Sequence, residues 1–425
     1  MSYTGSEVDT QIRASNASIH RETLKRRQGQ TADVFPNRVP VMPHPFPADP
    51  IAAVVHPDPY PYYADLRGRG GLQRDETLGL WIATRADMVD RLLREPAGRV
   101  RPPAEPVPRF LIGTRAGAVF AALARMNDGK PHIAQRAWVE ALLRHVERAG
   151  RADVARIADD MAGPWRRDGD PGALDAMIRD LPTTVVVAAL GVPETERPAL
   201  VSATAAWVAG LSVRADDAAR TAAIAAMDRL LDHLSALGTA DSHTDIDDAA
   251  AHVALLMQPH EATAGWIGAG VLQLARDAAL LAAARNGSFD AEAFGSEVLR
   301  HDPPIQNTRR TLVADVSIGD CTMRAGASVL IVLASAERDP RRHAEPDRFR
   351  LDRPRPPALG LGAGPHRCPG GGLALRMACA AWHALAKDAP PDAFDALADR
   401  VRWRPSANVR APVFGAAPRH DSLAS

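Results

Sequence analysis

Apolar residues recur at helical spacing along most of the chain from about residue 116 onward. In these segments the apolar positions fall three or four residues apart, as they do on the buried face of an α-helix. Further helices are predicted after Asp290 and from Gly371 onward. The pattern predicts a mainly α fold. The segments with helical spacing are 134–149, 153–167, 198–210, 216–237 and 245–284.

Alternation of apolar and polar residues predicts a smaller amount of β-structure. A strand pair is predicted at 71–75 and 80–84, because residues 81–84 alternate and follow the turn-forming sequence Thr77-Leu-Gly79. The proline-rich segment 101–108 interrupts any helix. Short strands return after Thr311. We therefore expect helices together with small β-sheets.

The domain organisation follows from where these patterns begin. Residues 1–45 are polar and without periodicity, so they are predicted to form a flexible N-terminal arm. No internal repeat or linker divides the remainder. Residues 46–425 are therefore expected to form one large domain.

Composition and charge exclude several classes of protein. The 425 residues contain 46% apolar residues, which is ample for a core. Lys plus Arg and Asp plus Glu number 51 each, so nothing predicts binding to nucleic acid. The polar N-terminus predicts neither a signal peptide nor a membrane segment. The three cysteines are too few and too scattered for a disulfide framework, which favours a cytoplasmic location.

One cysteine lies in a glycine-rich loop directly before a predicted helix. The loop reads Leu361-Gly-Ala-Gly-Pro-His-Arg-Cys-Pro-Gly370. Glycines allow the main chain to approach a flat partner closely, and the positive end of the following helix is expected to favour the thiolate of Cys368. A thiolate is what a cysteine ligand to heme iron requires. A dinucleotide-binding loop is excluded because the last glycine of that fingerprint is missing.

Read as Phe-Gly-x-Gly-x-His-x-Cys-x-Gly, this loop resembles the cysteine-ligand loop of the cytochrome P450 family, with Leu361 in place of the usual Phe. The resemblance implies the cytochrome P450 fold in a protein of the soluble bacterial type, enclosing heme b. It implies that Cys368 binds the iron and that Gly362 and Gly370 approach the heme.

Two further groups of residues match the family in order and spacing. Glu297 and Arg300 lie three apart on a predicted helix, where they share a face. The resemblance implies that Arg348, in Pro346-Asp-Arg-Phe349, completes a buried structural triad with them. It also implies that four residues contact the heme propionates, beginning with two that lie four apart on one helix face. These four are His132, Arg136, Arg310 and His366.

The central helix departs from the family. The family's Ala-Gly-x-Asp/Glu-Thr corresponds here to Gln258-Pro259-His260-Glu261-Ala262. The family's threonine and acid belong to a relay that delivers protons for dioxygen activation, and Ala262 cannot form a hydrogen bond. His260-Glu261 also occurs in the helix of zinc proteases. That helix needs a second metal ligand at position 264, which is alanine here, so a zinc site is excluded.

We expect the lost hydroxyl to be replaced by groups around the same position. Gln258 lies four residues before Ala262, on the same helix face. Pro259 cannot donate a hydrogen bond to the carbonyl of Leu255 and is expected to kink the helix. Protons would then arrive through water held by Glu261, by Gln258 or by the substrate.

Two classes of function remain open. The first is a monooxygenase or oxidative coupling enzyme that receives electrons from a separate ferredoxin and ferredoxin reductase, as Glu261 favours. The second uses peroxide, rearranges an oxidised substrate, or binds heme without turnover, as Gln258, Pro259 and Ala262 favour. By resemblance the substrate is a medium-sized molecule of secondary metabolism, and the protein a monomer. Its pocket is expected from 99–130, 201–233, the central helix, 305–307 and 413–414, with Trp207, Gln306 and Asn307 among the lining residues.

Overall fold

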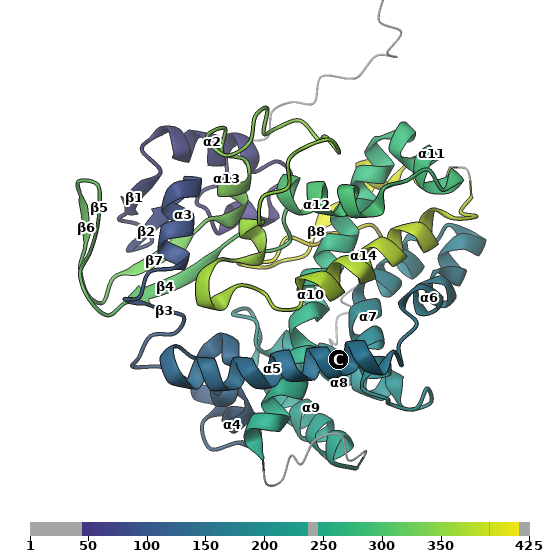
Figure 1. Cartoon of the computed structure of the whole chain (residues 1–425), viewed down its shortest axis with the longest axis horizontal. Coiled ribbons are helices and arrows are strands. Elements are labelled where there is room, and N and C mark those ends of the chain that lie inside the picture. Colours follow the sequence, from purple (N-terminus) through teal and green to yellow (C-terminus); the bar gives the residue numbers. More distant parts are fainter. Residues whose placement is uncertain (1–44, 237–244, 391, 416–425) are drawn as a thin grey trace, which may run out of the picture. The chain divides into compact units, whose positions relative to one another are not determined.

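Helix α10, Ile246–Arg276, runs through the middle of the molecule (Figure 1). It begins at Asp245, whose carboxylate accepts hydrogen bonds from the backbone N–H groups of Asp247 and Asp248. The predicted helix 245–284 is in fact two helices. Asp277 ends α10 and caps α11, Ala278–Asn286, by accepting from its first N–H groups. A new helix begins here because the Asp277 carboxylate satisfies backbone N–H groups that would otherwise be left without a partner at the start of α11.

The computed structural model describes residues 45–236, 245–390 and 392–415. The chain divides after Pro45, and the predicted arm lies outside the described residues apart from Pro45 itself. The other described α-helices are α2 (Tyr60–Gly68), α3 (Ala86–Leu93), α4 (Arg115–Ala122), α5 (Gly129–Ala149), α6 (Val154–Asp168), α7 (Pro171–Ala189), α8 (Arg197–Gly210), α9 (Asp217–Ala236), α12 (Ala291–His301), α13 (Leu333–Glu337), α14 (Gly371–Ala386) and α15 (Leu397–Arg400).

Most predicted helices are confirmed, with two differences besides the break at Asp277. Helix α5 begins at Gly129, five residues before the predicted start, and therefore carries both His132 and Arg136. Helix α7 was not predicted. Its second half is buried on nearly all sides and contains Pro182, so its sequence shows neither the polar face nor the composition that marks a surface helix.

The β-structure is small, as predicted. One sheet has the order β1-β2-β7-β4-β3 and forms from segments far apart in the sequence. The predicted strand pair is confirmed as β1 and β2, which are antiparallel, while β2 and β7 are parallel. The strands are β1 (Leu72–Asp75), β2 (Leu80–Ala83), β3 (Gly98–Arg99), β4 (Thr308–Leu312) and β7 (Ser328–Ile331), with two hairpins, β5 (Val316–Ile318) with β6 (Cys321–Met323), and β8 (Arg402–Trp403) with β9 (Pro412–Val413).

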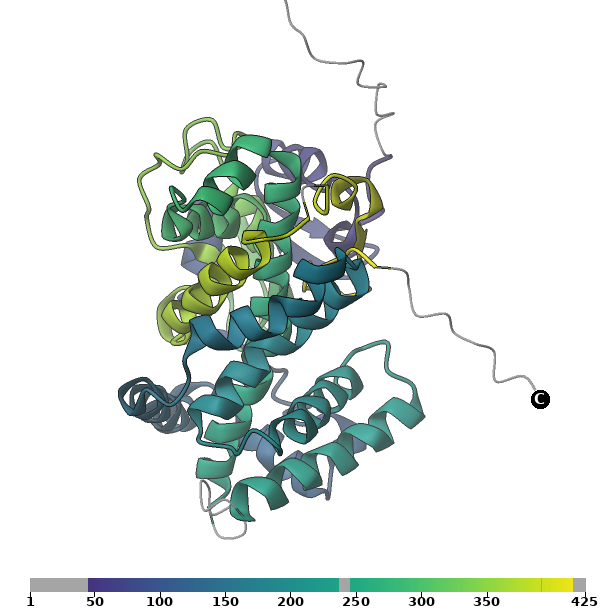
Figure 2. The same ribbon diagram turned by 90° about the vertical axis from the view of Figure 1, so that its right-hand side faces the viewer.

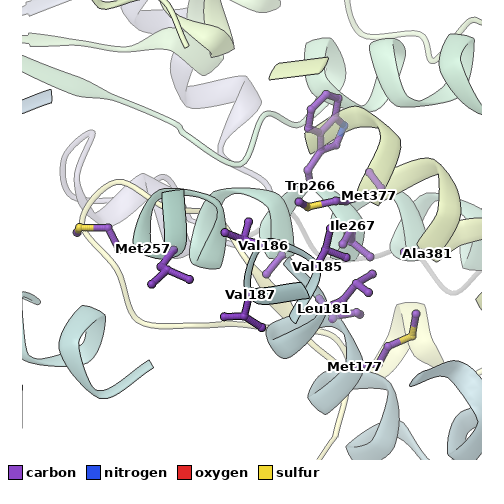
Figure 3. Packing of buried hydrophobic residues seen from close by; sticks show 14 of the residues in the cluster. Met177, Leu181, Val185, Val186, Val187, Met257, Trp266, Ile267, Met377 and Ala381 are labelled. Carbon is purple, nitrogen blue, oxygen red and sulfur yellow. The ribbon is translucent and has the colours of Figure 1, made fainter. Parts of the chain in front are cut away.

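The core forms where α10 packs against α7 and α14. Figure 3 shows Leu181 and Val185 of α7 beside Ile267 of α10 and Met377 of α14. Trp382 of α14 donates a hydrogen bond of 2.8 Å from its indole Nε1 to the carbonyl of Ile267. A Cβ at Gly270 would lie 2.3 Å from this indole, so glycine is what allows the two helices to approach.

Helices α8 and α9 pack side by side and also contact α4 and α10 (Figure 2, teal). Gly210 makes their approach possible, because a Cβ there would lie 2.3 Å from Cβ of Ala223. Among the described residues no single helix is both long and apolar enough to cross a membrane. The pair α10 and α11 meets that test only when taken together, and it bends by 110°.

Candidate heme site

The cysteine loop is held in shape by its own backbone. It contains the 3₁₀ turns η4 (Leu359–Leu361) and η5 (Gly364–His366) and ends at α14. The N–H of Cys368 donates to the carbonyl of Leu361 at 2.8 Å, which closes the loop. Gly362 and Gly364 have φ of 74° and 65°, a left-handed conformation that favours glycine. These contacts place Cys368 at the N-terminal end of α14.

The side chain of Cys368 is exposed, although its environment is dry. Burial raises the pKa of its thiol, while hydrogen bonds from the N–H groups of Gly370 and Gly371 and the charge of Arg136 act in the opposite direction. The N–H groups at the helix end therefore favour the thiolate, as expected, but desolvation is the larger effect and the pKa of the thiol is raised overall.

Two predicted propionate contacts lie side by side at one edge of this loop. The rings of His132 and His366 are 4.2 Å apart between centroids. Nε2 of His366 lies 3.0 Å from Oδ1 of Asp128, a residue that the sequence did not single out. Burial, followed by the charges of His366 and Arg136, lowers the pKa of His132. The sequence therefore identified this cluster except for its acid.

Arg310 reaches the same edge from the sheet. It lies on β4, is buried, and its side chain donates to Thr308 and to the carbonyl of Arg309. Burial lowers the pKa of its guanidinium, and Asp128 is the acid that acts against this shift. A buried cation without a direct ion pair is available to an anionic partner.

Arg136 is engaged differently from the prediction. Its Nε donates to Glu140 at 2.7 Å, and its Nη1 donates to the carbonyls of Pro365 and Arg367 at 3.0 and 2.7 Å. The guanidinium thus ties α5 to the cysteine loop. Its contact with a propionate remains a prediction, whereas its contact with the loop is observed.

The predicted buried triad exists with a different third member. Arg300 donates from Nε and Nη2 to the two carboxylate oxygens of Glu297, both at 2.8 Å. The second guanidinium on Glu297 is that of Arg353, whose Nε lies 3.1 Å from Oε1. The prediction of Arg348 is wrong. Its side chain is 70% exposed and pairs with Glu345, and it contributes only its backbone carbonyl to Arg300 and Arg353.

The middle of α10 borders a space, unlike the helix on either side of it. Residues 249–257 and 263–272 are buried, whereas Gln258, Pro259, Glu261 and Ala262 are partly exposed. Helix α10 continues through Pro259, so the proline does not end it. Nη2 of Arg404, just after β8, lies 3.1 Å from Oε1 of Glu261.

Three residues predicted to line the substrate pocket are buried and bonded to the protein. Trp207 is fully buried and donates to the sulfur of Met257. Gln306 accepts from Tyr63 and donates to the carbonyl of Pro303, and Asn307 donates to the carbonyl of Ala407. These contacts tie all three side chains to the protein, and their place in a substrate pocket remains a prediction.

The residues around Cys368 fit heme. Gly370 has φ of −91°, and a Cβ there would meet no protein atom within 4 Å, so the loop leaves its face clear for a flat ligand. The edge formed by His132, Arg310 and His366 provides donors and positive charge for two propionates. Among the described residues no group of three His, Cys, Asp or Glu side chains could hold a metal ion by itself.

Comparison with known proteins agrees with this geometry. The family model "Cytochrome P450" matches residues 291–384. The chain is 30% identical over 382 residues to the cytochrome P450 monooxygenase PikC of Streptomyces venezuelae, covering 83% of this chain and 89% of that protein. The chain belongs to the cytochrome P450 family. It is also 30% identical to cytochrome P450 107B1 of Saccharopolyspora erythraea over 61% of this chain and 68% of that one.

Solved structures of the same fold extend over most of the chain. The structure of CalO2 matches with a TM-score of 0.72 and 23% identity, covering 86% of this chain and 96% of that one. P450 RauA, solved with a biosynthetic intermediate of aurachin RE, matches with a TM-score of 0.68 and 21% identity over 84% and 94%. The cofactor of this cytochrome P450 is heme b, which supplies redox chemistry with dioxygen when bound.

Sequence reasoning missed four residues of this region. Asp128 and Arg353 lie beside motifs that it did use, at the start of the His132 segment and just after Phe349. Arg125 and Arg404 belong to a short 3₁₀ turn and to the start of a hairpin loop, where no periodicity or motif marks them. Arg404 is brought to Glu261 by the fold alone, and the charge of Glu261 also acts on Arg125.

Proposed function

We propose that this cytochrome P450 inserts oxygen into, or oxidatively couples, a medium-sized organic substrate, with electrons from a separate ferredoxin and ferredoxin reductase. Cys368 would bind the heme iron, and His132, Arg310 and His366 would hold the propionates. We infer that it works in the cytoplasm as a monomer, with residues 46–425 as the heme domain. A substrate from secondary metabolism is supported by the likeness to RauA, which was solved with a biosynthetic intermediate.

The observation that carries the proposal is the position of Cys368. Cys368 is exposed at the N-terminal end of α14, in a loop whose edge carries His132, His366 and the buried Arg310. A thiol that merely fills core space would be covered by apolar side chains.

The groups that would move protons belong to the middle of α10. Gln258 and Glu261 are partly exposed there and Ala262 offers no hydroxyl, so we propose that water bound by these two residues delivers protons to the reaction. The same departure favours a second candidate, a peroxide-dependent or rearranging enzyme. A third possibility, a heme protein without turnover, shares the same cysteine loop.

One experiment separates these candidates. The purified heme protein would be tested for the thiolate-type absorption band of its reduced, carbon monoxide-treated form. It would then be supplied with ferredoxin, ferredoxin reductase and NADPH, or with hydrogen peroxide alone, and products from a library of medium-sized substrates would be identified by mass spectrometry. We expect product with the ferredoxin system. Product with peroxide alone would favour the second candidate, and a thiolate band without product in either system would favour the third.

A further inference from the structure

The cysteine loop is fastened to the rest of the protein near both of its ends. Toward the far end, Arg136 donates to the carbonyls of Pro365 and Arg367. At the near end, in the turn η4, the backbone N–H of Gly360 donates a hydrogen bond of 3.0 Å to the carboxylate of Glu337, the last residue of α13. The contacts of Arg136 are exposed, whereas Glu337 is buried, with 1% of its surface exposed.

The bond from Gly360 to Glu337 reaches Cys368 in one further step. Gly360 is followed directly by Leu361, whose carbonyl accepts the N–H of Cys368 at 2.8 Å. A shift of Gly360 therefore moves the carbonyl that fixes the backbone of Cys368. Partners that do not touch a metal themselves orient the ligands that do. Glu337 is thus placed to act on Cys368 without contacting it.

The carboxylate of Glu337 has little else to hold. Its Oε2 lies 3.4 Å from Nε2 of His343, a buried imidazole, but the two groups are not aligned for a hydrogen bond. Among the described residues no hydrogen bond other than that of Gly360 reaches this carboxylate. A buried charge is costly unless it is bonded, and an N–H bond to a carboxylate is roughly twice as strong as one between neutral groups. The contact with Gly360 is therefore a strong restraint.

Packing does not replace this restraint. Glu337, His343 and Leu361 line a cavity of about 270 Å³, together with Gly371, the first residue of α14. A segment that borders a cavity lacks side-chain contacts on that side, so it has room to move there. The start of the cysteine loop consequently depends on its hydrogen bonds.

We propose that Glu337 is a positioning residue for the iron ligand. Its buried carboxylate holds Gly360 and, through Leu361, keeps Cys368 where its thiolate binds iron. This inference rests on the proposed function, because it takes Cys368 as the ligand. Without the carboxylate the loop should loosen, and the bound thiolate should more readily take up a proton from water and become a neutral thiol.

Hydrogen exchange tests the contact directly, because an amide exchanges when its own hydrogen bond opens. The heme-loaded wild type, Glu337→Ala and Glu337→Gln would be compared by mass spectrometry that resolves single amides. In Glu337→Ala the N–H groups of Gly360 and Cys368 should exchange about tenfold faster, the lower end of the effect of losing a hydrogen bond to a charged group. In Glu337→Gln the side-chain oxygen can still accept from Gly360, so both rates should stay within about threefold of wild type. Equal acceleration in both variants, or in neither, would overturn the inference.

Asp339→Ala is the matched control. Asp339 is as buried as Glu337, and its carboxylate also accepts from backbone N–H groups, those of Ala86 and Arg341, at 2.9 and 3.0 Å. Its loss should speed exchange at those two amides and leave Cys368 within about twofold of wild type. Acceleration at Cys368 in this control as large as in Glu337→Ala would indicate a general loss of stability and overturn the inference.

A second variant keeps the test valid if Glu337→Ala does not fold. Glu337→Asp retains the charge, but its side chain is one methylene shorter and should not reach Gly360. It should therefore speed exchange at Gly360 and Cys368 as Glu337→Ala does. Wild-type exchange in Glu337→Asp would contradict the proposed role of the contact.

The spectrum of the reduced, carbon monoxide-treated protein tests the consequence for the ligand. In Glu337→Ala, or in Glu337→Asp in its place, the thiolate-type band should decay about fivefold faster than in wild type or Asp339→Ala, each measured equally far below its melting temperature. Fast exchange at Gly360 with decay at the wild-type rate would make the contact merely structural and overturn the inference alone. A wild-type protein that never shows the band would overturn the proposed function, and the inference with it, whatever the exchange rates.

Discussion

The two sides of the heme site differ in how completely the protein satisfies its own polar groups. On the cysteine side the carboxylate of Glu297 accepts hydrogen bonds from Arg300, Arg353 and the backbone N–H of Arg350. On the side of α10, the side chain of Gln258 has no hydrogen bond with any described residue, and Arg404 has a buried nitrogen without an acceptor. On the first side the buried carboxylate of Glu297 is satisfied by the protein itself. On the second side, polar groups of Gln258 and Arg404 remain available to water and substrate, and we expect the reaction to depend on them.

The sharpest test of the cysteine side is Cys368→Ala. It should abolish the thiolate-type band of the reduced, carbon monoxide-treated protein, because no other sulfur is placed in the loop. Cys379→Ala is the matched control. Cys379 lies on α14 among apolar residues, where burial raises the pKa of its thiol to about 11, and its loss should leave the spectrum unchanged. A thiolate band in Cys368→Ala would contradict the assignment.

The second test compares two nearby arginines of the scaffold. Arg353→Ala should destabilise the protein by on the order of 3 kcal/mol, because it breaks a buried ion pair with Glu297. Arg348→Ala should change stability by less than about 0.5 kcal/mol, because that side chain is exposed. Apparent melting temperature and the yield of heme-loaded protein measure both effects. Equal losses in the two variants would restore Arg348 to the triad.

The third test addresses the cationic edge. Arg310→Ala should weaken heme retention by about 1.5–3 kcal/mol, the range for a hydrogen bond to a charged group, and leave the thiolate band of the remaining heme unchanged. Transfer of heme to apomyoglobin measures retention. Arg309→Ala, at the exposed neighbouring position, is the control. Unchanged transfer in Arg310→Ala would remove this residue from the propionate site.

The contrast also explains what could be predicted from the sequence. The cysteine loop and the pair Glu297 and Arg300 are local: their function depends on residues within one loop or one helix turn, so spacing alone identifies them. Arg353 is not local, and the choice between it and Arg348 depends on how the chain folds back after Phe349. The break at Asp277 was missed because helical spacing continues across it, while a single N-cap decides where the helix ends.

The open side of the site was the least predictable. Arg404 lies more than 140 residues after Glu261 and pairs with it only in the folded protein, which no periodicity in the sequence records. Gln306 and Asn307 show the opposite case. Their polar character suggested a pocket, but the amide nitrogen of each side chain donates a hydrogen bond to a backbone carbonyl of the protein. Polarity in a sequence indicates that a partner exists, and only the fold shows whether the partner is the protein or a ligand.

On the α10 side, Gln258→Ala should uncouple electron use from product formation. The amide is expected to hold water near the reacting centre, so its loss should lower the share of electrons that reach product and raise hydrogen peroxide release severalfold. NADPH consumption, product and peroxide would be measured together. Gln273→Ala is the matched amide control on the same helix, about four turns away near its C-terminal end. Unchanged coupling in Gln258→Ala would exclude the amide from proton delivery.

The smallest expected effect is the most informative about this side of the site. Ala262→Thr restores the family's residue. If proton delivery now depends on Gln258, Glu261 and water, the added hydroxyl should change coupled turnover by less than about twofold, or lower it by crowding a partly exposed position. A tenfold rise would correspond to about 1.4 kcal/mol of barrier. Such a rise, together with normal coupling in Gln258→Ala, would mean that the central helix has lost a relay without replacing it. The difference between the two sides would then reflect damage rather than specialisation, and the unsatisfied groups around Glu261 would have to be explained by substrate binding alone.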